Sequence, residues 1–416
     1  MRITGSLTAL SLLLLCGNAE AGALKAQGFI DLRVVSPSNA QNWQHGGLGK
    51  LRFDGNGGQD VNAEIPQIMA EARAQLTAEL SGMLLFRYAP DQKTAVDLLE
   101  GYLRYRPVST TPWRGAVKLG AFFPPISLEN TDLGWTSPWT LTPSAINSWV
   151  GEELRTIGGE ATVEHRWIAS SLVLRAAIYG WNDPAGILIA DRGWALGDKP
   201  TGLFDHLRLP DAVAVSRGRR PPAQTLTYRE IDNRPGWYAG LAWQQDGLGR
   251  FEVLRYDNSA NASAYDQQFA WATDFWSLGA SIPFGDFTVL TQAMVGKTVV
   301  APSPTFKGVT DFSSAYVLLG WAHKTVRLAA RAEVFNTVER HPHFPHDGDD
   351  EDYPPDPELS EHGHAVTLAA NWLPTSYLRV SAEVLRLNSF RTQRAAVGLS
   401  PRLVETQLQL NLRVYF

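Results

Sequence analysis

Two arginines, Arg327 and Arg331, lie four residues apart in a segment where polar and apolar residues alternate. In an extended strand this spacing places both guanidinium groups on the same face. Four more charged residues occupy polar positions of this and other alternating segments: Glu100, Arg104, Lys118 and Glu333. Charges on the inner faces of several strands can attract and orient ions, so we predict that these six residues line a water-filled pore. The open alternative is that they solvate the interior or pair with each other across strands.

A second group of charges lies in the long connection from Pro124 to Glu153. Its acidic residues are Glu129, Asp132, Glu152 and Glu153, and its tryptophans are Trp135, Trp139 and Trp149. If this connection folds inward against basic residues of the strands, the opposing charges set up a transverse field at a constriction. We therefore predict a constriction loop here. The alternative is a surface loop covered by its own tryptophans.

Histidines and acids are concentrated in the connection from Val338 to His362. They are His341, His343, His346 and His362, beside Asp347, Asp349, Asp350, Glu351 and Asp352. Imidazoles and carboxylates can bind zinc, copper or calcium. However, the spacing does not match a calcium-binding loop. We predict a solvated acidic loop without a metal.

The sequence contains no motif of a known catalytic centre. It has no G-x-S-x-G, H-E-x-x-H, Walker loop or G-x-G-x-x-G. His165 beside Arg166 and His206 beside Asp205 could belong to a hydrolase at a barrel rim, but an isolated histidine is more often an ordinary loop residue. We predict that the protein is not an enzyme and holds no cofactor.

The composition argues against several classes of protein. Charged residues make up 19% of the 416 residues, against roughly 25% in soluble domains. The net charge of −5 gives no reason to expect a nucleic-acid partner. The single cysteine, Cys16, excludes a disulfide scaffold and a thiolate metal site.

The first twenty-one residues have the pattern of a secretory signal. Arg2 precedes the apolar run from Leu7 to Cys16, and Ala19-Glu20-Ala21 fits a cleavage site. We predict a signal peptide over residues 1–21 and an exported, cysteine-free chain over residues 22–416. A buried N-terminal helix and a lipoprotein signal at Cys16 are the alternatives.

The chain beyond residue 21 alternates with a period of two, which is typical of strands with one apolar and one polar face. In the last segment Leu408, Leu410 and Leu412 alternate with polar residues. Sixteen candidate strands follow from this pattern: 28–35, 59–66, 72–88, 95–106, 114–123, 154–165, 167–181, 236–244, 249–257, 268–282, 286–299, 312–322, 325–337, 363–373, 376–390 and 403–416. Several run for about ten residues, the length that a tilted strand needs to cross a bilayer.

The connections between these strands alternate in length. The predicted long ones are 124–153, 182–235, 258–267, 300–311, 338–362 and 391–402, and turns of one to four residues separate them. Outer-membrane barrels have short turns on the periplasmic side and long loops outside. No run of eighteen apolar residues follows residue 21, which excludes a transmembrane helix. We predict an all-β fold: a transmembrane antiparallel β-barrel of about 16 strands, with both termini on the periplasmic side.

Three segments resemble bacterial outer-membrane proteins. The terminal QLNLRVYF, ending in Phe416, is similar to their closing strand, whose final aromatic residue forms part of the assembly signal. DLLEGYLRYRP (Asp97–Pro107) and KLGAFFPPISLEN (Lys118–Asn130) resemble the phosphate-selective porin family and its porin-like relatives. That family lines its pore with ladders of Arg and Lys. The polar positions here carry mixed charges, so phosphate selectivity does not follow.

The resemblance implies a porin-like channel in the cell outer membrane that passes small hydrophilic solutes or ions by passive diffusion. It also implies contact with outer-membrane lipid, insertion by the barrel assembly machinery through the strand ending in Phe416, and a homotrimer. Two alternatives stay open. One is a substrate-specific channel for organic compounds, and the other is a structural barrel that does not conduct.

Overall fold

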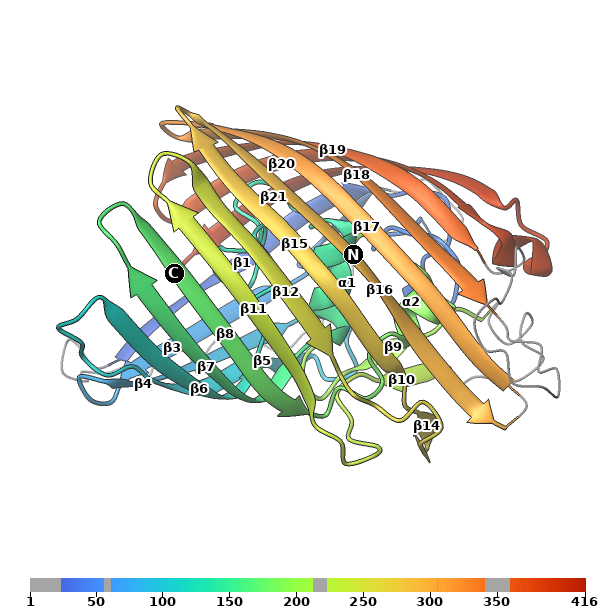
Figure 1. The fold of residues 1–416 in the computed structure, drawn as a ribbon. Helices are drawn as coiled ribbons and strands as arrows, with labels where there is room; N and C mark the ends of the chain where they lie inside the picture. The colour runs from blue at the N-terminus through green and yellow to red at the C-terminus, as the bar shows by residue number, and fades with distance from the viewer. Residues whose placement is uncertain (1–23, 56–60, 212–222, 305, 341–359) are drawn as a thin grey trace.

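The computed structural model describes residues 24–55, 61–211, 223–304, 306–340 and 360–416. Within these residues one antiparallel sheet closes on itself and forms a barrel of sixteen strands (Figure 1). The predicted fold class is confirmed. Closure leaves no strand edge unpaired, which is the condition for a sheet to cross a bilayer.

The strands of the wall follow the order of the chain. They are β1 (Leu24–Ser36), β2 (Asn62–Glu64), β3 (Ile68–Gln75), β4 (Leu80–Tyr88), β5 (Val96–Tyr105), β6 (Trp113–Phe122), β7 (Thr156–Arg166), β8 (Ser170–Gly180), β11 (Gly236–Gln245), β12 (Gly249–Asp257), β15 (Ala272–Phe284), β16 (Phe287–Ser303), β17 (Phe306–His323), β18 (Val326–Arg340), β19 (Glu361–Thr375), β20 (Leu378–Arg391) and β21 (Arg402–Tyr415). β2 and β3 both pair with β1 and form one wall strand. It is interrupted at residues 65–67, where Pro66 has no N–H to donate to the ladder.

The predicted strand over residues 72–88 is wrong, because the chain turns back at residues 76–79. The carbonyl oxygen of Leu80 accepts hydrogen bonds from the N–H groups of Leu76 and Thr77 at 2.9 and 3.1 Å. The Thr77 hydroxyl oxygen also accepts from the N–H of Leu80 at 3.0 Å, which closes the turn. Polar and apolar residues alternate through this tight turn, so the period does not reveal it. The predicted strand 59–66 overlaps β2, and the count of sixteen strands is unchanged.

The predicted long connection over residues 300–311 is also wrong. β16 and β17 stay paired as far as Ser303 and Phe306, with a shift of register after Val300. Pro302 and Pro304 suggest a loop in the sequence, but Pro302 lies at this irregularity, where a proline is tolerated in a sheet.

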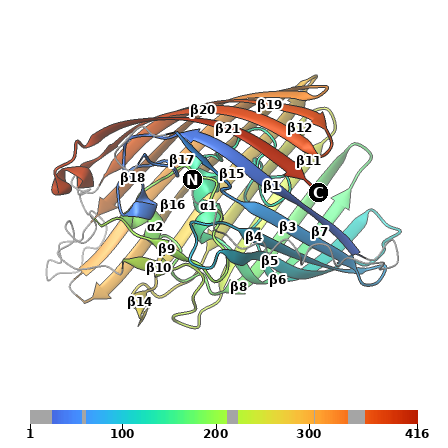
Figure 2. The same cartoon turned by 180° about the vertical axis from the view of Figure 1, so that it is seen from behind.

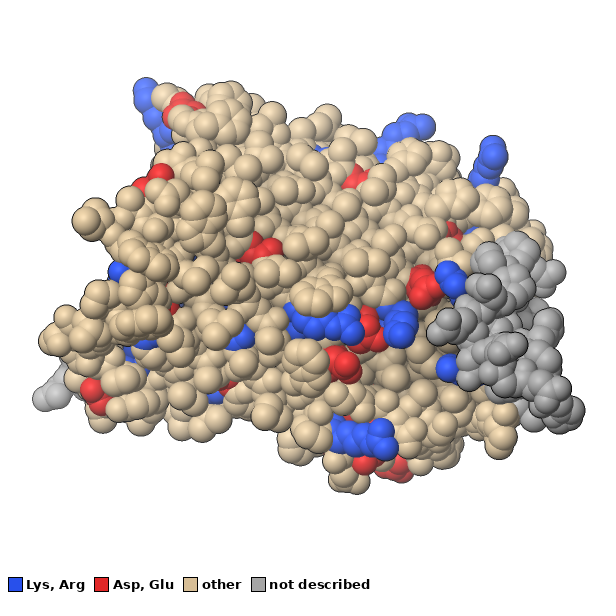
Figure 3. Space-filling view, viewed as in Figure 1, with Lys and Arg blue, Asp and Glu red and all other residues tan. Residues whose placement is uncertain are grey.

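Side chains of the wall are arranged opposite to those of a soluble protein. On β21 the apolar Leu408 and Leu410 are exposed, whereas Gln407 and Gln409 are buried. The same alternation recurs on β18, where Leu328 is exposed. Figure 3 shows an outer surface that is mostly uncharged, with charged atoms gathered in a few places. This is the arrangement of a barrel with lipid outside and polar groups inside.

Three connections from the long-loop end lie inside the barrel. We name them the β1–β2 segment (37–55), the β6–β7 segment (123–155) and the β8–β11 segment (181–211). They carry the short helix η2 (Trp43–His45), α1 (Ala145–Glu153), α2 (Ile187–Asp191) and β9 (His206–Arg208), and Figures 1 and 2 show α1 within the ring of strands. β9 pairs with β10 (Gln224–Leu226). Among the described residues, no helix is both long and apolar enough to cross a membrane.

The remaining short elements lie in the connections that follow β12 and β20. β13 (Tyr265–Asp266) pairs with β14 (Gln268–Phe269), and η4 spans Thr392–Val397. These elements do not contribute to the wall.

The barrel closes between its first and last strands. β1 pairs with β21 from Phe29 opposite Tyr415 to Ser36 opposite Leu408. The N–H and carbonyl of Phe416 pair with those of Gly28 at 3.0 and 2.9 Å. The first and last strands of the wall therefore meet, and Gly28 and Phe416 lie at its short-turn end.

The barrel lumen as candidate functional site

The β6–β7 segment is anchored to the wall by a buried ion pair. Arg331 on β18 donates from Nη1 to Oε1 of Glu129 at 2.5 Å, and both side chains are fully buried. The other oxygen of Glu129 accepts from the N–H of Ser144 at 2.9 Å and from the amide of Asn147 at 3.0 Å. Hydrogen bonds between charged partners are roughly twice as strong as neutral ones. This contact therefore fixes two parts of the segment to one point of the wall.

Two wall carboxylates hold the beginning of α1. Glu333 on β18 accepts from the N–H of Ala145 at 2.7 Å. Glu383 on β20 accepts from the N–H groups of Leu141 and Thr142 at 2.6 and 3.1 Å. The first N–H groups of a helix have no partner within it, and the helix N-terminus carries partial positive charge. Glu333 thus satisfies one of these donors, and Glu383 holds the residues that lead into the helix.

The other two inserted segments are held in a similar way. Lys50 of the β1–β2 segment donates to Glu361 on β19 at 2.6 Å, and both side chains are fully buried. Arg192 of the β8–β11 segment makes two parallel bonds to Glu152 of α1 at 2.9 and 2.7 Å. A buried charge without a partner is costly, so each pair favours the inserted position of its segment.

Glu153 joins α1 to α2. Its carboxylate accepts from the N–H groups of Gly186 and Leu188 at 3.0 and 3.1 Å and from the indole N–H of Trp149. Burial raises the pKa of Glu153 to about 7. The two helices therefore share one carboxylate in the middle of the lumen, and this group titrates near neutral pH.

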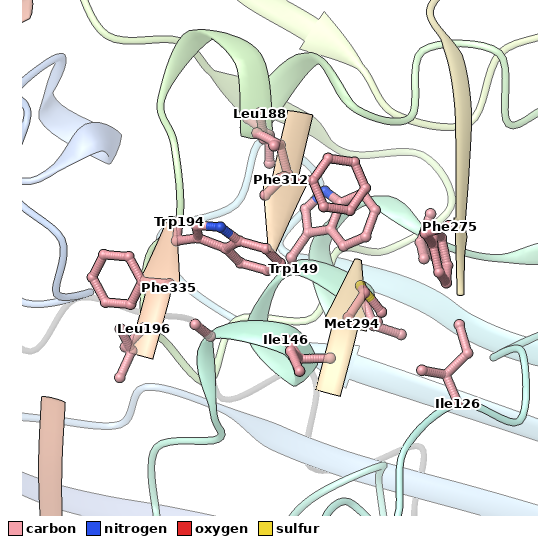
Figure 4. Close-up of a cluster of buried hydrophobic side chains, with 14 of the residues drawn as sticks. Ile126, Ile146, Trp149, Leu188, Trp194, Leu196, Phe275, Met294, Phe312 and Phe335 are labelled. Carbon is pink, nitrogen blue, oxygen red and sulfur yellow. The ribbon is translucent and has the colours of Figure 1, made fainter. Parts of the chain in front are cut away.

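A hydrophobic core lies inside the barrel, between α1 and the wall. The ring of Trp149 packs edge-on against Trp194, Phe275 and Phe312, with centroids 6.0, 5.6 and 5.3 Å apart. Figure 4 shows these side chains pointing toward one another from the inserted segments and the strands. Other members of this cluster are Ile126, Ile146, Leu188, Leu196, Met294 and Phe335. The inserted segments are thus packed against the wall as in a protein core.

Two cavities lie in the lumen at the short-turn end, with volumes of about 400 and 380 Å³. Both are lined by Thr131, Asp132 and Tyr415. The larger cavity is also lined by Glu71, Arg73, Glu100, Tyr102 and Trp135, and the smaller by Arg327. Charged and aromatic groups in a space of this size can contact a small solute or a hydrated ion.

A much narrower space lies between the β6–β7 and β8–β11 segments, next to the larger cavity. Its volume is about 20 Å³, enough for about one water molecule. Asn130 and Trp135 line both spaces. The far side of the gap is lined by Gly197 and Asp198, and Ser137 and Asn147 contribute further polar groups.

The six predicted pore-lining residues fall into three pairs. Glu100 and Arg327 line the cavities at the short-turn end. Lys118 lies 3.7 Å from the carboxylate of Glu160 and opposite the exposed Arg104 in the register of β5 and β6. The other two, Arg331 and Glu333, face inward but are buried against the β6–β7 segment.

The four predicted constriction-loop acids also separate. Asp132 lines both cavities, with its carboxylate 3.8 Å from the guanidinium of Arg379 on β20. Glu129 contacts the basic wall through Arg331. In contrast, Glu152 and Glu153 contact the β8–β11 segment and not the wall.

Sequence reasoning missed a charged network that holds the β1–β2 segment. Asp198 accepts from Arg33 of β1 at 2.7 Å and from Arg52 of that segment at 3.0 Å. Asp31 of β1 pairs with Arg413 of β21 at 2.8 Å. The alternation of β1 already places Asp31 and Arg33 on its inner face, so the parity used for other strands could have identified them. Nothing in the sequence marks Asp198 as their partner.

Neither predicted histidine pair forms a catalytic arrangement in the described residues. His165 packs between the rings of Trp113 and Trp167, with centroids 4.4 and 4.3 Å away. His206 lies 3.2 Å from the ammonium of Lys93.

The described part of the chain contains one group of three acids with carboxylate oxygens close enough to hold a metal ion. It consists of Asp183, Glu230 and Asp232, whose oxygens lie within 4.8 Å of one another. This group lies outside the predicted histidine-rich connection. Residues 341–359 of that connection lie outside the described residues.

No family model and no curated protein sequence matches the chain. Solved structures do match it. The outer membrane channel DcaP of Acinetobacter baumannii superposes with a TM-score of 0.56 at 10% identity, over 96% of this chain and 99% of that one. OmpT, an outer membrane protein of Vibrio cholerae, gives 0.51 at 10% identity, over 96% and 99%. OprB of Pseudomonas putida gives 0.50 at 11% identity, over 95% and 94%. At this identity the likeness shows the shared barrel fold.

Proposed function

We propose that the protein is an outer-membrane channel through which small hydrophilic solutes or ions pass by passive diffusion. The observation that carries this proposal is the inverted barrel, with an apolar outer wall and a charged lumen that contains cavities at its short-turn end. A closed sheet with this polarity is stable only with lipid around it. The fold shared with the outer membrane channel DcaP agrees with this function.

The inserted segments would restrict what passes. A barrel of sixteen strands without insertions encloses a wide aqueous channel. Here a gap of about 20 Å³ lies next to the larger cavity, and polar side chains of the β6–β7 and β8–β11 segments line it. We infer that this gap is the constriction, and that the pairs Arg331–Glu129 and Arg192–Glu152 set its width by fixing the segments.

The same gap favours a second candidate, a channel specific for one class of small organic solute. A narrow, polar constriction next to cavities lined by Tyr102, Trp135 and Tyr415 can select by contact as well as by size. A general porin would pass many hydrophilic solutes at rates set mainly by their size. A specific channel would show saturable flux for its own solutes.

Conductance of the purified chain in planar bilayers tests the main proposal. We expect discrete conductance steps from the chain over residues 22–416, and larger steps when residues 132–143 of the β6–β7 segment are deleted. An unchanged step size after deletion would remove this segment as the constriction. A folded barrel that conducts neither before nor after deletion would be structural. Liposome swelling with sugars and organic acids then separates general diffusion from saturable transport.

The remaining assignments belong to the same proposal. Residues 1–21 are a signal peptide, and the short turns face the periplasm. The strand ending in Phe416 presents the barrel to the assembly machinery, and the channel forms homotrimers. The proposal includes no enzymatic activity, cofactor or resident metal.

A further inference from the structure

The outer face of the wall carries charge at its long-loop end, and this charge is distributed unevenly around the barrel. Over β12 to β18, bases and acids alternate on neighbouring strands. Arg255 pairs with Asp274 at 2.5 Å, and Arg340 pairs with Asp311 at 2.9 Å. Lys297 lies opposite both acids in the registers of β16 with β15 and β17. Figure 3 shows blue and red atoms adjacent to one another on this face.

The next three strands carry bases on the outer face without acids. Their exposed polar side chains at the long-loop end form a group that we name the basic patch: His362, His364, Arg386, Asn388, Arg402 and Thr406. The acids of β19, β20 and β21 are Glu361, Glu383 and Glu405, and all three are buried on the inner face. The positive charge of Arg386 and Arg402 is therefore not balanced on the outside of these strands.

The members of the basic patch are neighbours across the strands. Arg386 lies directly opposite Thr406, and Asn388 lies opposite His364. Side chains in such positions have Cβ atoms about 5 Å apart. Phe390 lies opposite both Arg402 and His362, and its ring stacks on the imidazole with centroids 5.0 Å apart. The patch thus gathers hydrogen-bond donors and cations on three adjacent strands, with the apolar Phe390 and Val404 between them.

An apolar groove lies on the same strands, nearer the short-turn end, and extends onto β1 and β2. Its volume is about 850 Å³, and most of its lining is carbon. Ala370 and Ala382 lie opposite each other on β19 and β20, and these small side chains leave a hollow. Trp372, Leu410 and Leu412 contribute to its walls. Outward apolar residues, including Val384 and Leu408, continue from the groove to the basic patch.

The spacing of the two features matches one membrane leaflet. From Arg386 to Val380 the strand spans six residues, roughly 20 Å at about 3.4 Å per residue. A tilt of about 40° reduces this to roughly 15 Å along the membrane normal. One leaflet of hydrocarbon is also about 15 Å thick, half of the ~30 Å core.

We propose that β19, β20 and β21 form a binding site for an anionic lipid with a phosphate-bearing headgroup. The phosphate contacts Arg386 and Arg402 in the basic patch, and the acyl chains occupy the groove beside Trp372. The site requires that the barrel spans a membrane, but it does not require that the lumen conducts. Over β12 to β18 the outward arginines are already paired with Asp274 and Asp311, so they are less available to an anionic headgroup than Arg386 and Arg402.

Native mass spectrometry of the detergent-folded chain over residues 22–416 tests the site. Dioleoyl phosphatidylglycerol and dioleoyl phosphatidylcholine serve as probes, because they share acyl chains and differ in headgroup charge. We expect tighter binding of phosphatidylglycerol. Arg386→Gln with Arg402→Gln should weaken that binding about fivefold per arginine, since each arginine near an anionic lipid surface contributes about that factor. Binding of phosphatidylcholine should not change.

Arg255→Gln with Arg340→Gln is the matched control, because it also removes two outward arginines at the same end of the barrel. An equal loss in the control, or no loss in the patch variant, would overturn the site. Heat-dependent gel mobility establishes for each variant that the barrel is folded. Single-channel conductance is measured separately, so that loss of channel activity and loss of lipid binding remain distinct results.

A second variant addresses the groove. Ala382→Trp should fill the hollow and weaken binding of both lipids, while the headgroup preference remains. If Ala382→Trp instead converts an oligomer to monomers and leaves lipid binding intact, the groove is a contact between copies of the chain, and the acyl-chain part of the proposal is wrong.

Discussion

Arg331 and Glu129 form an ion pair that is fully enclosed in the lumen, with 2.5 Å between Nη1 and Oε1. The arginine belongs to the wall and the glutamate to the inserted β6–β7 segment. Neither group is in contact with bulk water. The pair is therefore one of the contacts that hold the segment in its inserted position.

Removal of one partner should release the segment. In Glu129→Ala the guanidinium of Arg331 stays buried without its acid, which costs about 3–5 kcal/mol. We expect larger or noisier single-channel currents and a lower melting temperature. Glu164→Ala is the control, because Glu164 pairs with Arg166 at 2.7 Å on the exposed surface, where an ion pair contributes little to stability. Identical currents in all three proteins would show that the segment stays in place without the pair.

The hydrophobic core of the lumen gives a second prediction. Trp149→Ala leaves a cavity among Trp194, Phe275 and Phe312, and such a change costs about 3–5 kcal/mol. We expect near-ultraviolet circular dichroism to show melting of the inserted segments at a lower temperature, while the amide signal of the barrel persists. Trp276→Ala on the outer wall is the control, since this ring is exposed on the outer face and does not contact the core. An equal effect of both substitutions would argue against a separately packed lumen.

The ion preference of the channel should depend on Glu100. In the larger cavity the charges of Glu71 and Arg73 compensate each other through two bonds of 2.5 and 3.0 Å. Glu100 accepts a hydrogen bond from the backbone N–H of Phe123. This donor is neutral, so it does not balance the negative charge of the carboxylate. Glu100→Gln should therefore move the reversal potential in a salt gradient toward anions. Lys297→Gln changes a charge on the outer wall and should leave it unchanged. No shift with Glu100→Gln would place the permeation path elsewhere.

The pH dependence of the lumen should depend on Glu153. Burial raises its pKa to about 7, above the usual 4.5 of a glutamate. Because the folded state then holds the proton more tightly than the unfolded state, stability from this group is present below pH 4.5 and is lost as the pH rises through 7. We expect the inserted segments to melt at a lower temperature at pH 8.5 than at pH 5.5.

Glu153→Gln isolates this contribution from that of other titrating groups. The amide stays neutral at both pH values. Its single oxygen can still accept from one of the N–H groups of Gly186 and Leu188, which bond to different oxygens of Glu153. The difference in melting temperature between pH 5.5 and 8.5 should therefore be smaller in the variant. A difference as large as in the native chain would assign the dependence to other groups.

The sequence predicts the barrel well because the wall obeys a local rule. Lipid outside and polar groups inside impose a period of two on every strand, and this period can be read from Leu408, Leu410 and Leu412 alone. The rule mispredicts strand ends in two places. At Leu76 and Thr77 the alternation continues through a turn, and at Pro302 the prolines suggest a loop where the strand continues.

The contents of the lumen could be predicted only in part. The position and acids of the β6–β7 segment indicate a constriction loop, and its Glu129 contacts the wall. The β1–β2 and β8–β11 segments carry no comparable signal. Asp198 binds Arg33 across 165 positions of the chain, and such pairing follows from the closure of the barrel, not from any local pattern.

Closure of the barrel gives the last prediction. The ring of Phe416 occupies the space beside Gly28 where any other residue would carry a Cβ atom, only 2.4 Å from that position. Gly28→Val should therefore displace Phe416, and Phe416→Ala should remove its packing, so both should slow closure between β1 and β21. We expect a longer half-time for the appearance of the folded band on unheated gels during refolding into lipid vesicles. Phe284→Ala removes an exposed aromatic residue at the same end of the barrel, away from the seam, and should fold at the native rate. Equal rates in all variants would show that β1 and β21 pair after the step that limits folding.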